Sequence, residues 1–275
     1  MFKINLRKIK TMIYSSNNPD IYVISYPKSG RTWLRLLIGR YLSLKYRLPE
    51  NDIISTEVIT KKSDLPIVSF THDGSAMLDK KKYKELSYNK QVYVNKKVIL
   101  MGRGIKDTLV SAYFQATKRI NVFDGTISEF IYSEEFGIHK ILTFYDIWIR
   151  NQHIPKSFLF IRYEDLHQNA RSILTKVLLF IGETNIDKNF LYNSIEYCSF
   201  NNLKNFEKQG RFDDDMLKVG NINDTESYKV RKGIVGGYKE YLSSENQKFI
   251  DDKIKEYKFK FTSFNKLNEG RCEIK

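Results

Sequence analysis

Residues 22–42 read YVISYPKSGRTWLRLLIGRYL, and this stretch decides the fold. Residues 22–26 are β-prone, and after the turn the apolar residues keep helical spacing through about residue 45. A strand that runs directly into a helix leaves the unpaired N–H groups and partial positive charge of the helix N-terminus at the turn, where anions bind. The stretch therefore predicts a buried strand, an anion-binding turn and a helix. An ordinary structural turn served by Gly30 is the simpler alternative.

The turn differs from the P-loop of nucleotide hydrolases. That loop ends in Gly-Lys followed by Ser or Thr, whereas here Lys28 precedes Gly30. The sequence also offers no convincing strand that ends in an aspartate to hold Mg²⁺, as phosphoryl-transferring P-loop enzymes require. The turn is therefore predicted to be P-loop-like, with Lys28 directed at the anion and without a metal.

Strands and helices alternate along the rest of the chain. Strands are predicted near 22–26, 65–74, 97–102 and 158–163, and helices near 105–119, 137–152, 169–183 and 243–257. This order predicts an α/β fold: a single domain over 1–275, with a central parallel sheet flanked by helices and a motif-bearing core over about 20–258. A polar, glycine-dotted stretch at about 208–230 lacks periodicity and is predicted to be a mobile loop.

The charge of the chain predicts an anionic partner. Lys and Arg number 46 against 32 Asp and Glu, a formal net charge of +14, which suits nucleic acid, a membrane surface or a phosphorylated small molecule. The two cysteines, Cys198 and Cys272, lie far apart, which fits a reducing compartment. No apolar run has the length of a membrane span, and the basic N-terminus is a poor signal peptide. A cytoplasmic protein is therefore expected.

Two further clusters have the chemistry of a phosphate site. In RGIKDTLVSAYF (103–114), Arg103 ends a strand and Ser111 lies in the helix that follows. In VRKGIVGGY (230–238), Arg231, Lys232 and Gly233 join adjacent cations to a glycine N–H. Together they predict a second anion site through charge-assisted hydrogen bonds. A strand-end arginine and a solvated basic turn remain the simpler alternatives.

The segments YPKSGRTW, RGIKDTLVSAYF, YEDL and RKGIVGGYKEYL resemble, over about 22–258, the cytosolic-type sulfotransferase family. The resemblance implies one α/β domain that transfers a sulfuryl group from 3′-phosphoadenylyl sulfate (PAPS) to a hydroxyl or amine and releases PAP, without a metal. By motif position, the residues implied for the 5′-phosphosulfate are Lys28, Ser29, Gly30, Arg31 and Thr32. Those implied for the 3′-phosphate are Arg103, Ser111, Arg231, Lys232 and Gly233. Those implied to face adenine are Trp33, Tyr163 and Phe200.

The same resemblance implies three catalytic residues. His72, in FTHDG, matches the catalytic histidine of the family, and histidine suits the role of general base because its pKa lies near neutrality. Lys28 is expected to stabilise charge on the leaving phosphate oxygen, and Ser111 is assigned to the same machinery. Two positions depart from the family pattern: Arg31 stands where a threonine is usual, and Phe70 where a lysine is usual.

Further features of the sequence concern the adenine site, the oligomeric state and the acceptor. Cys198 stands where a threonine is commoner, which weakens the assignment of Phe200, and the dimer signature of animal members is not seen. The acceptor is expected to be a glycan or a hydroxylated small metabolite. The side chains expected around it are Tyr113, Phe114, Phe123, Phe144, Tyr145, Trp148, Asp213, Asp214 and Asp215; core packing and a solvated loop are the alternatives.

Two other functions stay open at this point. An ATP-dependent small-molecule kinase would need a magnesium-binding carboxylate and would show no preference for a 3′-phosphate. A non-enzymatic binder of polyanions or nucleic acid is favoured by the net charge. The recognition motifs of nucleic-acid modules are not found in the sequence, however, so no nucleic acid is expected as a partner.

Overall fold

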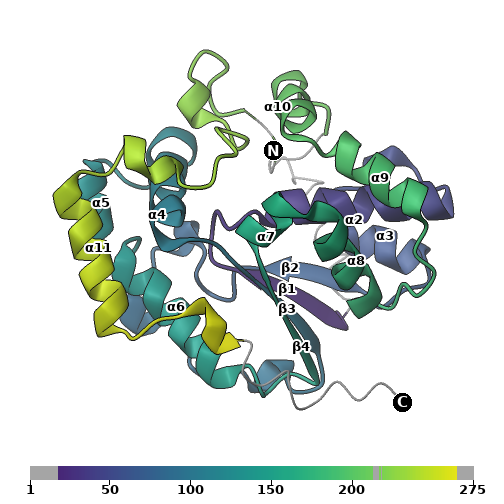
Figure 1. The fold of residues 1–275 in the computed structure, drawn as a ribbon, viewed down its shortest axis with the longest axis horizontal. Coiled ribbons are helices and arrows are strands. Elements are labelled where there is room, and N and C mark those ends of the chain that lie inside the picture. Colours follow the sequence, from purple (N-terminus) through teal and green to yellow (C-terminus); the bar gives the residue numbers. More distant parts are fainter. Residues whose placement is uncertain (1–17, 213–216, 218, 265–275) are drawn as a thin grey trace, which may run out of the picture.

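The computed structural model describes residues 18–212, 217 and 219–264 (Figure 1). Four strands form one sheet in the order β2-β1-β3-β4, and every neighbouring pair is parallel. The strands are β1 (Ile21–Ser25), β2 (Val68–Thr71), β3 (Lys97–Gly102) and β4 (Ser157–Arg162). The predicted single α/β domain with a central parallel sheet is confirmed.

Helices cover both faces of the sheet (Figure 1). They are α2 (Arg31–Tyr46), α3 (Thr56–Lys62), α4 (Ile105–Phe114), α5 (Ile127–Tyr132), α6 (Ile138–Asn151), α7 (Tyr163–Gln168), α8 (Ala170–Phe180), α9 (Lys188–Tyr197), α10 (Phe200–Gln209) and α11 (Ser244–Glu256). The sequence patterns predicted α2, α4, α6, α8 and α11. They missed α3, α5 and α7, which at six or seven residues are too short to show a helical period, and they also missed α9 and α10, which have ten residues each.

The core has two apolar layers, one on each face of the sheet. Successive strand residues point to opposite faces, so Val23 and Ile99 join the layer under α2, α3, α8 and α9, whereas Ile24 and Leu100 join the layer under α4, α5, α6 and α11. The central strands are therefore buried on both sides, as their continuous apolar runs require.

The expected acceptor role of three aromatic residues is wrong. Phe144, Tyr145 and Trp148 of α6 are almost fully buried in the second apolar layer, and none of them lines the site cavity described below. Tyr113 and Phe123 also pack against this layer without lining that cavity. An amphipathic helix on a sheet must bury its apolar stripe, and here that stripe is the aromatic one.

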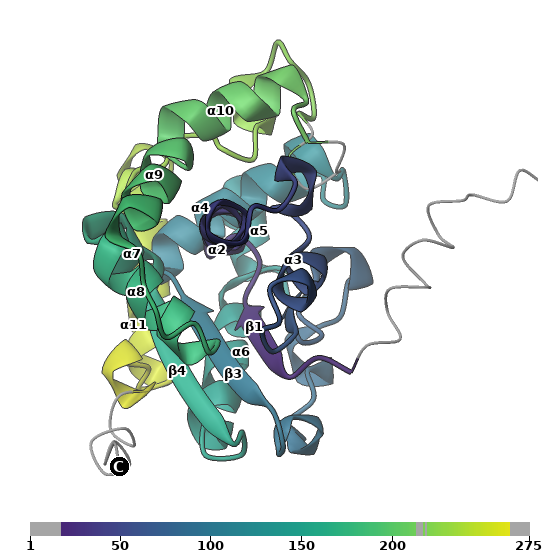
Figure 2. The ribbon, with the colours of Figure 1, turned by 90° about the vertical axis from the view of Figure 1, so that its right-hand side faces the viewer.

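The carboxyl ends of the parallel strands meet at one edge, and the loops that follow them carry the chemistry-bearing residues. Figure 2 shows α10 at the same end of the molecule. Asp213, Asp214 and Asp215, part of the predicted mobile loop, lie outside the described residues, so its mobility stays a prediction. Within the described ranges, no helix combines the length and apolarity that a membrane crossing needs.

Candidate active site

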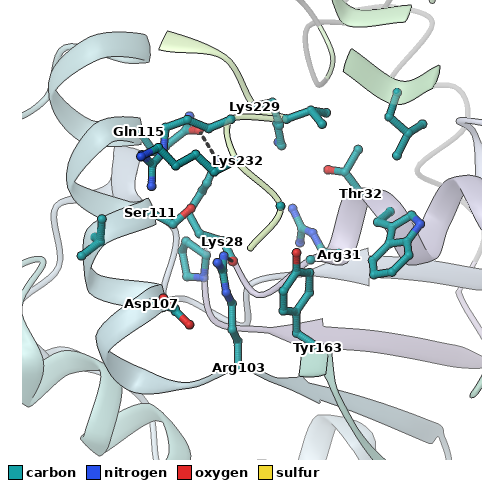
Figure 3. A pocket seen from close by; sticks show the side chains of 18 of the residues that line it. Lys28, Arg31, Thr32, Arg103, Asp107, Ser111, Gln115, Tyr163, Lys229 and Lys232 are labelled. Carbon is teal, nitrogen blue, oxygen red and sulfur yellow. Dashed lines mark hydrogen bonds between the residues drawn. The ribbon is translucent and has the colours of Figure 1, made fainter. Parts of the chain in front are cut away.

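A cavity of about 450 Å³ opens at the carboxyl edge of the sheet (Figure 3). The structure brings to its wall nearly all the residues that the sequence nominated: Lys28, Gly30, Arg31, Thr32, Trp33, His72, Arg103, Ser111, Tyr163, Phe200, Arg231, Lys232 and Gly233. Ser29 is the exception, because it is fully buried and does not line the cavity. Segments separated by up to about two hundred residues therefore share one site.

The turn after β1 has the backbone of an anion cradle. Lys28 and Gly30 both have positive φ, 70° and 93°, and Gly30 is the N-cap of α2. Such left-handed residues next to a helix N-terminus turn successive N–H groups toward one point. A side chain on Gly30 would place Cβ 2.5 Å from Tyr163 Cδ2 and 2.9 Å from Met101 Cε. Both the conformation and the close packing therefore require glycine at this position.

Lys28 is held in place but its charge is not balanced. Its Nζ donates to Gln115 Oε1 at 3.1 Å, and its carbonyl oxygen accepts from Arg103 Nη1 at 2.9 Å. Burial, and after it the charges of Lys229 and other cations, hold the pKa of Lys28 well below its usual value. A bound anion would supply the missing negative charge and raise that pKa again.

Gln115 reaches Lys28 because the helix changes its winding there. The sequence predicted one helix over 105–119, but α4 ends at Phe114 and a π-helical turn follows over Gln115–Arg119. Single π turns inside helices often occur at functional sites. Sequence periodicity does not distinguish a π turn from regular helix, so Gln115 was missed.

Aromatic rings line another part of the cavity. The ring centroids of Trp33 and Tyr163 lie 5.9 Å apart, and the Arg103 guanidinium lies 4.5 Å from the Tyr163 centroid. A Cβ on Gly233 would come within 2.4 Å of Phe200 Cδ2, so this ring packs directly on the backbone of the 230–238 segment. Flat apolar walls with a cation nearby suit a planar aromatic group.

His167 belongs to this ring-lined part, although the sequence gave it no role. It lines the cavity, its ring lies 6.0 Å from that of Tyr163, and its Nε2 donates to Gly233 O at 2.8 Å. One signal was present in the sequence: His167 follows Tyr163 by four residues, so on one helix the two side chains share a face.

His72 is fixed as a neutral ring with one acceptor nitrogen. Its Nδ1 lies 2.8 Å from Ser25 O, and since a carbonyl oxygen only accepts, Nδ1 carries the proton and Nε2 is bare. Burial first, and the charge of Arg31 next, lower the pKa of His72 to about 3. At neutral pH the ring can therefore accept a proton from a hydroxyl group.

Asp73 anchors the chain directly after His72. Its carboxylate accepts from Trp148 Nε1 at 3.0 Å and Tyr93 Oη at 2.8 Å, and forms an ion pair with Lys90 Nζ at 2.6 Å. The sequence gave Asp73 no role, because its three partners lie 17 to 75 residues away. These contacts restrain the backbone that carries the histidine.

Arg231 and Lys232 lie in the cavity wall but are already paired. Arg231 Nη1 lies 2.8 Å from Glu226 Oε2, and Lys232 Nζ lies 2.5 Å from Glu240 Oε2. Their segment is tied to α4, because the Asp107 carboxylate accepts from the backbone N–H groups of Gly236 and Tyr238 at 2.7 and 3.0 Å. A phosphate at this point would have to compete with carboxylates for the same cations.

Comparison with known proteins identifies the family. A model of the sulfotransferase domain matches residues 18–263. The chain belongs to the sulfotransferase family. This sulfotransferase is 30% identical over 270 residues to cytosolic sulfotransferase 3 of Arabidopsis thaliana, covering 89% of this chain and 79% of the relative. It is 26% identical over 274 residues to sulfotransferase 1B1 of Mus musculus, with 91% and 85% covered.

Solved structures agree on the fold. A mouse sulfotransferase crystallised with PAP superposes with a TM-score of 0.62 at 21% identity, covering 92% of this chain and 90% of the other. The predictions of the sulfotransferase family and of a sulfotransferase activity are thus confirmed. Neither the kinase nor the non-enzymatic alternative is favoured by these comparisons.

The sulfotransferase places one more cation in the cavity, Lys229, which the sequence did not nominate. Its backbone N–H and that of Val230 donate to the two carboxylate oxygens of Glu207 at 2.6 and 2.8 Å. Burial, and then the charges of Arg119 and Arg31, lower the pKa of Lys229 to about 7. The sequence gave only a weak signal for Lys229: it lies two residues before Arg231 in a basic stretch. Sequence patterns could not show which of these side chains face the cavity.

Proposed function

We propose that this sulfotransferase takes its sulfuryl group from PAPS and uses His72 as the general base. The donor's 5′-phosphosulfate would lie on the turn of Lys28, Gly30, Arg31 and Thr32, with the backbone of Ser29 completing the loop. Two observations support this placement: the paired positive φ values of the turn, and the unbalanced charge of Lys28. The PAP in the solved mouse relative is further support.

The rest of the donor has matching partners in the cavity. Its 3′-phosphate would bind Arg103, Ser111, Arg231, Lys232 and Gly233, which lie in the same wall. The buried Nε of Arg103 makes no hydrogen bond within the described ranges, so a donor group is available there. The adenine would lie against Trp33, Tyr163 and Phe200.

In the reaction, the acceptor oxygen attacks the sulfur in line as the bond from sulfur to the 5′-phosphate oxygen breaks. His72 Nε2 takes the hydroxyl proton, and the Nδ1–H bond to Ser25 O keeps the ring in the tautomer that can do so. Lys28 stabilises the charge that develops on the leaving phosphate oxygen, and Ser111, which lines the same cavity, is proposed to assist it. The products are a sulfate ester and PAP.

Donor binding also improves the base. The nearby positive charges of Arg31 and Lys229 contribute to the low pKa of His72. An anionic phosphosulfate beside them offsets that effect and raises the pKa of His72 toward the range that suits proton transfer. His72 is therefore expected to become a stronger base only when the donor is bound.

The observation that carries the proposal is that His72 Nε2 and the anion cradle share one cavity with the 3′-phosphate candidates. Thermal unfolding with PAP, ATP or an oligonucleotide tests it. PAP at one hundred times its Kd should stabilise the protein by about 2.7 kcal/mol. Stabilisation by ATP but not PAP, with a strict Mg²⁺ requirement, would favour the kinase, and EDTA should change nothing for a sulfotransferase.

The same proposal includes an intracellular setting and a small acceptor. The Arabidopsis thaliana relative is named cytosolic sulfotransferase 3, which supports a cytoplasmic location. Hydroxylated small metabolites and glycans are the proposed acceptors. Feeding PAPS with a panel of hydroxyl acceptors tests this point, and turnover of simple phenols alone would contradict it.

A further inference from the structure

Two cations that line the cavity lie within electrostatic reach of His72, and one of them, Lys229, is not among those assigned to the donor phosphates. Arg31 comes from the first turn of α2, and Lys229 from the segment held by Glu207; both line the cavity (Figure 3). Both lower the pKa of His72, so both are within electrostatic reach of the base. The acceptor hydroxyl must approach His72, so these cations lie beside the bound acceptor.

Neither cation is balanced by a carboxylate. Over the described residues, no ion pair joins Arg31 or Lys229 to an acid, in contrast with Arg231 and Lys232. Burial, followed by the charge of Arg35, lowers the pKa of Arg31 to about 9. Glu207 is the nearby acid: its oxygens accept from the backbone N–H groups of Lys229 and Val230, it lies 3.9 Å from Arg119 Nη1, and its charge offsets only part of what lowers the pKa of Lys229. Arg31 and Lys229 are therefore placed to bind a negatively charged group of a ligand.

The donor does not account for both cations. The cradle N–H groups and Lys28 already face the 5′-phosphosulfate, and the 3′-phosphate has its own set of cations. Arg31 is the departure from the family pattern in the loop, and its strongest charged neighbour is Arg35. Lys229 lines the cavity from a segment whose backbone is held by Glu207.

The wall after His72 is apolar. Ala76, Met77 and Leu78 line the cavity there, and Leu78 is 70% exposed. An exposed leucine at the mouth of a pocket suits an apolar ligand surface. A ligand beside the base would therefore meet two cations on one side and apolar side chains on another.

We propose that the acceptor is an anion: a hydroxylated compound with an apolar body and a carboxylate, whose carboxylate binds Arg31 and Lys229 while its hydroxyl faces His72. This inference rests on the proposed function, since it assumes that His72 receives the acceptor hydroxyl. Arg31 lies in the donor loop as well, so Lys229 is the residue that separates acceptor recognition from donor binding.

The test uses three scaffolds, alicyclic, aryl and linear, each as a hydroxy acid, its primary amide and the matching amine. Transfer from PAPS should favour the acid over the amide by about 10- to 100-fold in kcat/KM, the value of a charge-assisted contact, and the amine should be the poorest. Lys229→Met should bring the ratio of acid to amide close to one, and Lys229→Arg should retain most of it. Lys239→Met, an exposed lysine outside the cavity, is the matched control and should keep the full ratio.

Failure of the inference can be told from failure of the proposed function. If PAP does not stabilise the protein, the proposed function fails. If PAP does stabilise it, but the acid has no advantage over the amide in turnover or in binding to the PAP complex, the inference alone is overturned. A preference for the amine would also overturn it and point to the acidic run Asp213, Asp214 and Asp215.

Discussion

Two groups of cations face the same cavity, and they differ in their partners. Arg231 and Lys232 are each paired with a glutamate, at 2.8 and 2.5 Å. Lys28, Arg31 and Lys229 have lowered pKa values and form no ion pair with a carboxylate among the residues described. When an anionic ligand binds, a paired cation must give up its carboxylate partner for the ligand. An unpaired cation has no such partner to lose and only gains the interaction with the ligand. The unpaired group should therefore contribute more binding free energy and cost more stability when the cavity is empty.

The largest effect is expected at the base that lies beside the unpaired group. His72→Ala should lower kcat by about 10²- to 10⁴-fold, the usual contribution of a positioned general base. The affinity for PAP, measured by thermal shift, should stay nearly the same. Wild-type turnover in this variant would show that His72 is only structural.

The second prediction compares one member of each group. Lys28→Met should lower kcat/KM by about 10²-fold, since it removes a charge at the leaving oxygen. Lys232→Met should cost only a few-fold, because Glu240 already offsets its charge. The measurement is steady-state kinetics with PAPS varied.

The same two variants should also differ in stability, and for Lys28→Met stability should change in the opposite direction from activity. Without ligand, Lys28→Met should raise the free energy of unfolding by about 0.5–2 kcal/mol, because it removes a buried unbalanced charge. Lys232→Met should change it by less than about 0.5 kcal/mol. Urea unfolding measures these changes. Equal changes in the free energy of unfolding for Lys28→Met and Lys232→Met would contradict the distinction between paired and unpaired cations.

The third prediction concerns pH. Lys229 has a pKa of about 7, below that of a free lysine, so it is charged below pH 7 and loses its charge as pH rises through that value. Arg31, with a pKa of about 9, stays mostly charged up to pH 8, and His72, with a pKa of about 3, stays neutral above pH 6. The KM of an anionic acceptor should therefore rise by up to about tenfold between pH 6 and pH 8.

Binding of the anion raises the pKa of Lys229, so the midpoint of this change should lie above 7. Lys229→Arg should flatten the profile, because arginine stays charged throughout. The neutral amide should show no comparable change in KM. A flat profile for the acid in the wild-type protein would exclude Lys229 as its partner.

The smallest effect is expected from a substitution that removes the carboxylate partner of a paired cation. Glu226→Gln removes the carboxylate that holds Arg231, so the 3′-phosphate no longer competes for that guanidinium. The affinity for PAP should rise about two- to fivefold at low salt, and the gain should shrink at high salt. Weaker binding would mean that Glu226 is needed mainly to position the segment.

The local parts of the site could be predicted from the sequence. The turn between β1 and α2 depends only on neighbouring residues, since the strand, the glycine and the helix lie within a short stretch. The alternation of strands and helices correctly predicted the parallel sheet. Strand ends of a parallel sheet meet at one edge, so Lys28, His72, Arg103 and Tyr163 were expected to meet. These features follow from local residue patterns and from the general topology of parallel sheets, both of which can be read from a sequence.

Contacts between distant segments could not be predicted. The aromatic stripe of α6 is visible in the sequence, but only the sheet decides that it is buried, so Trp148 was wrongly expected near the acceptor. Asp73 anchors the base through that same Trp148, 75 residues away. Likewise, Glu207 of α10 holds the backbone of Lys229, 22 residues further along the chain.

The sequence by itself determined the order of strands and helices, the anion cradle and the chemical type of the reaction, because these depend on local spacing and on a few specific motifs. Only the tertiary structure decided which cations have partners. An ion pair depends on the distance between side chains, and folding sets that distance independently of sequence separation. Lys28, Lys229 and Lys232 are the same residue type in one cavity wall, yet their surroundings lower the pKa of Lys28 and Lys229 and raise that of Lys232.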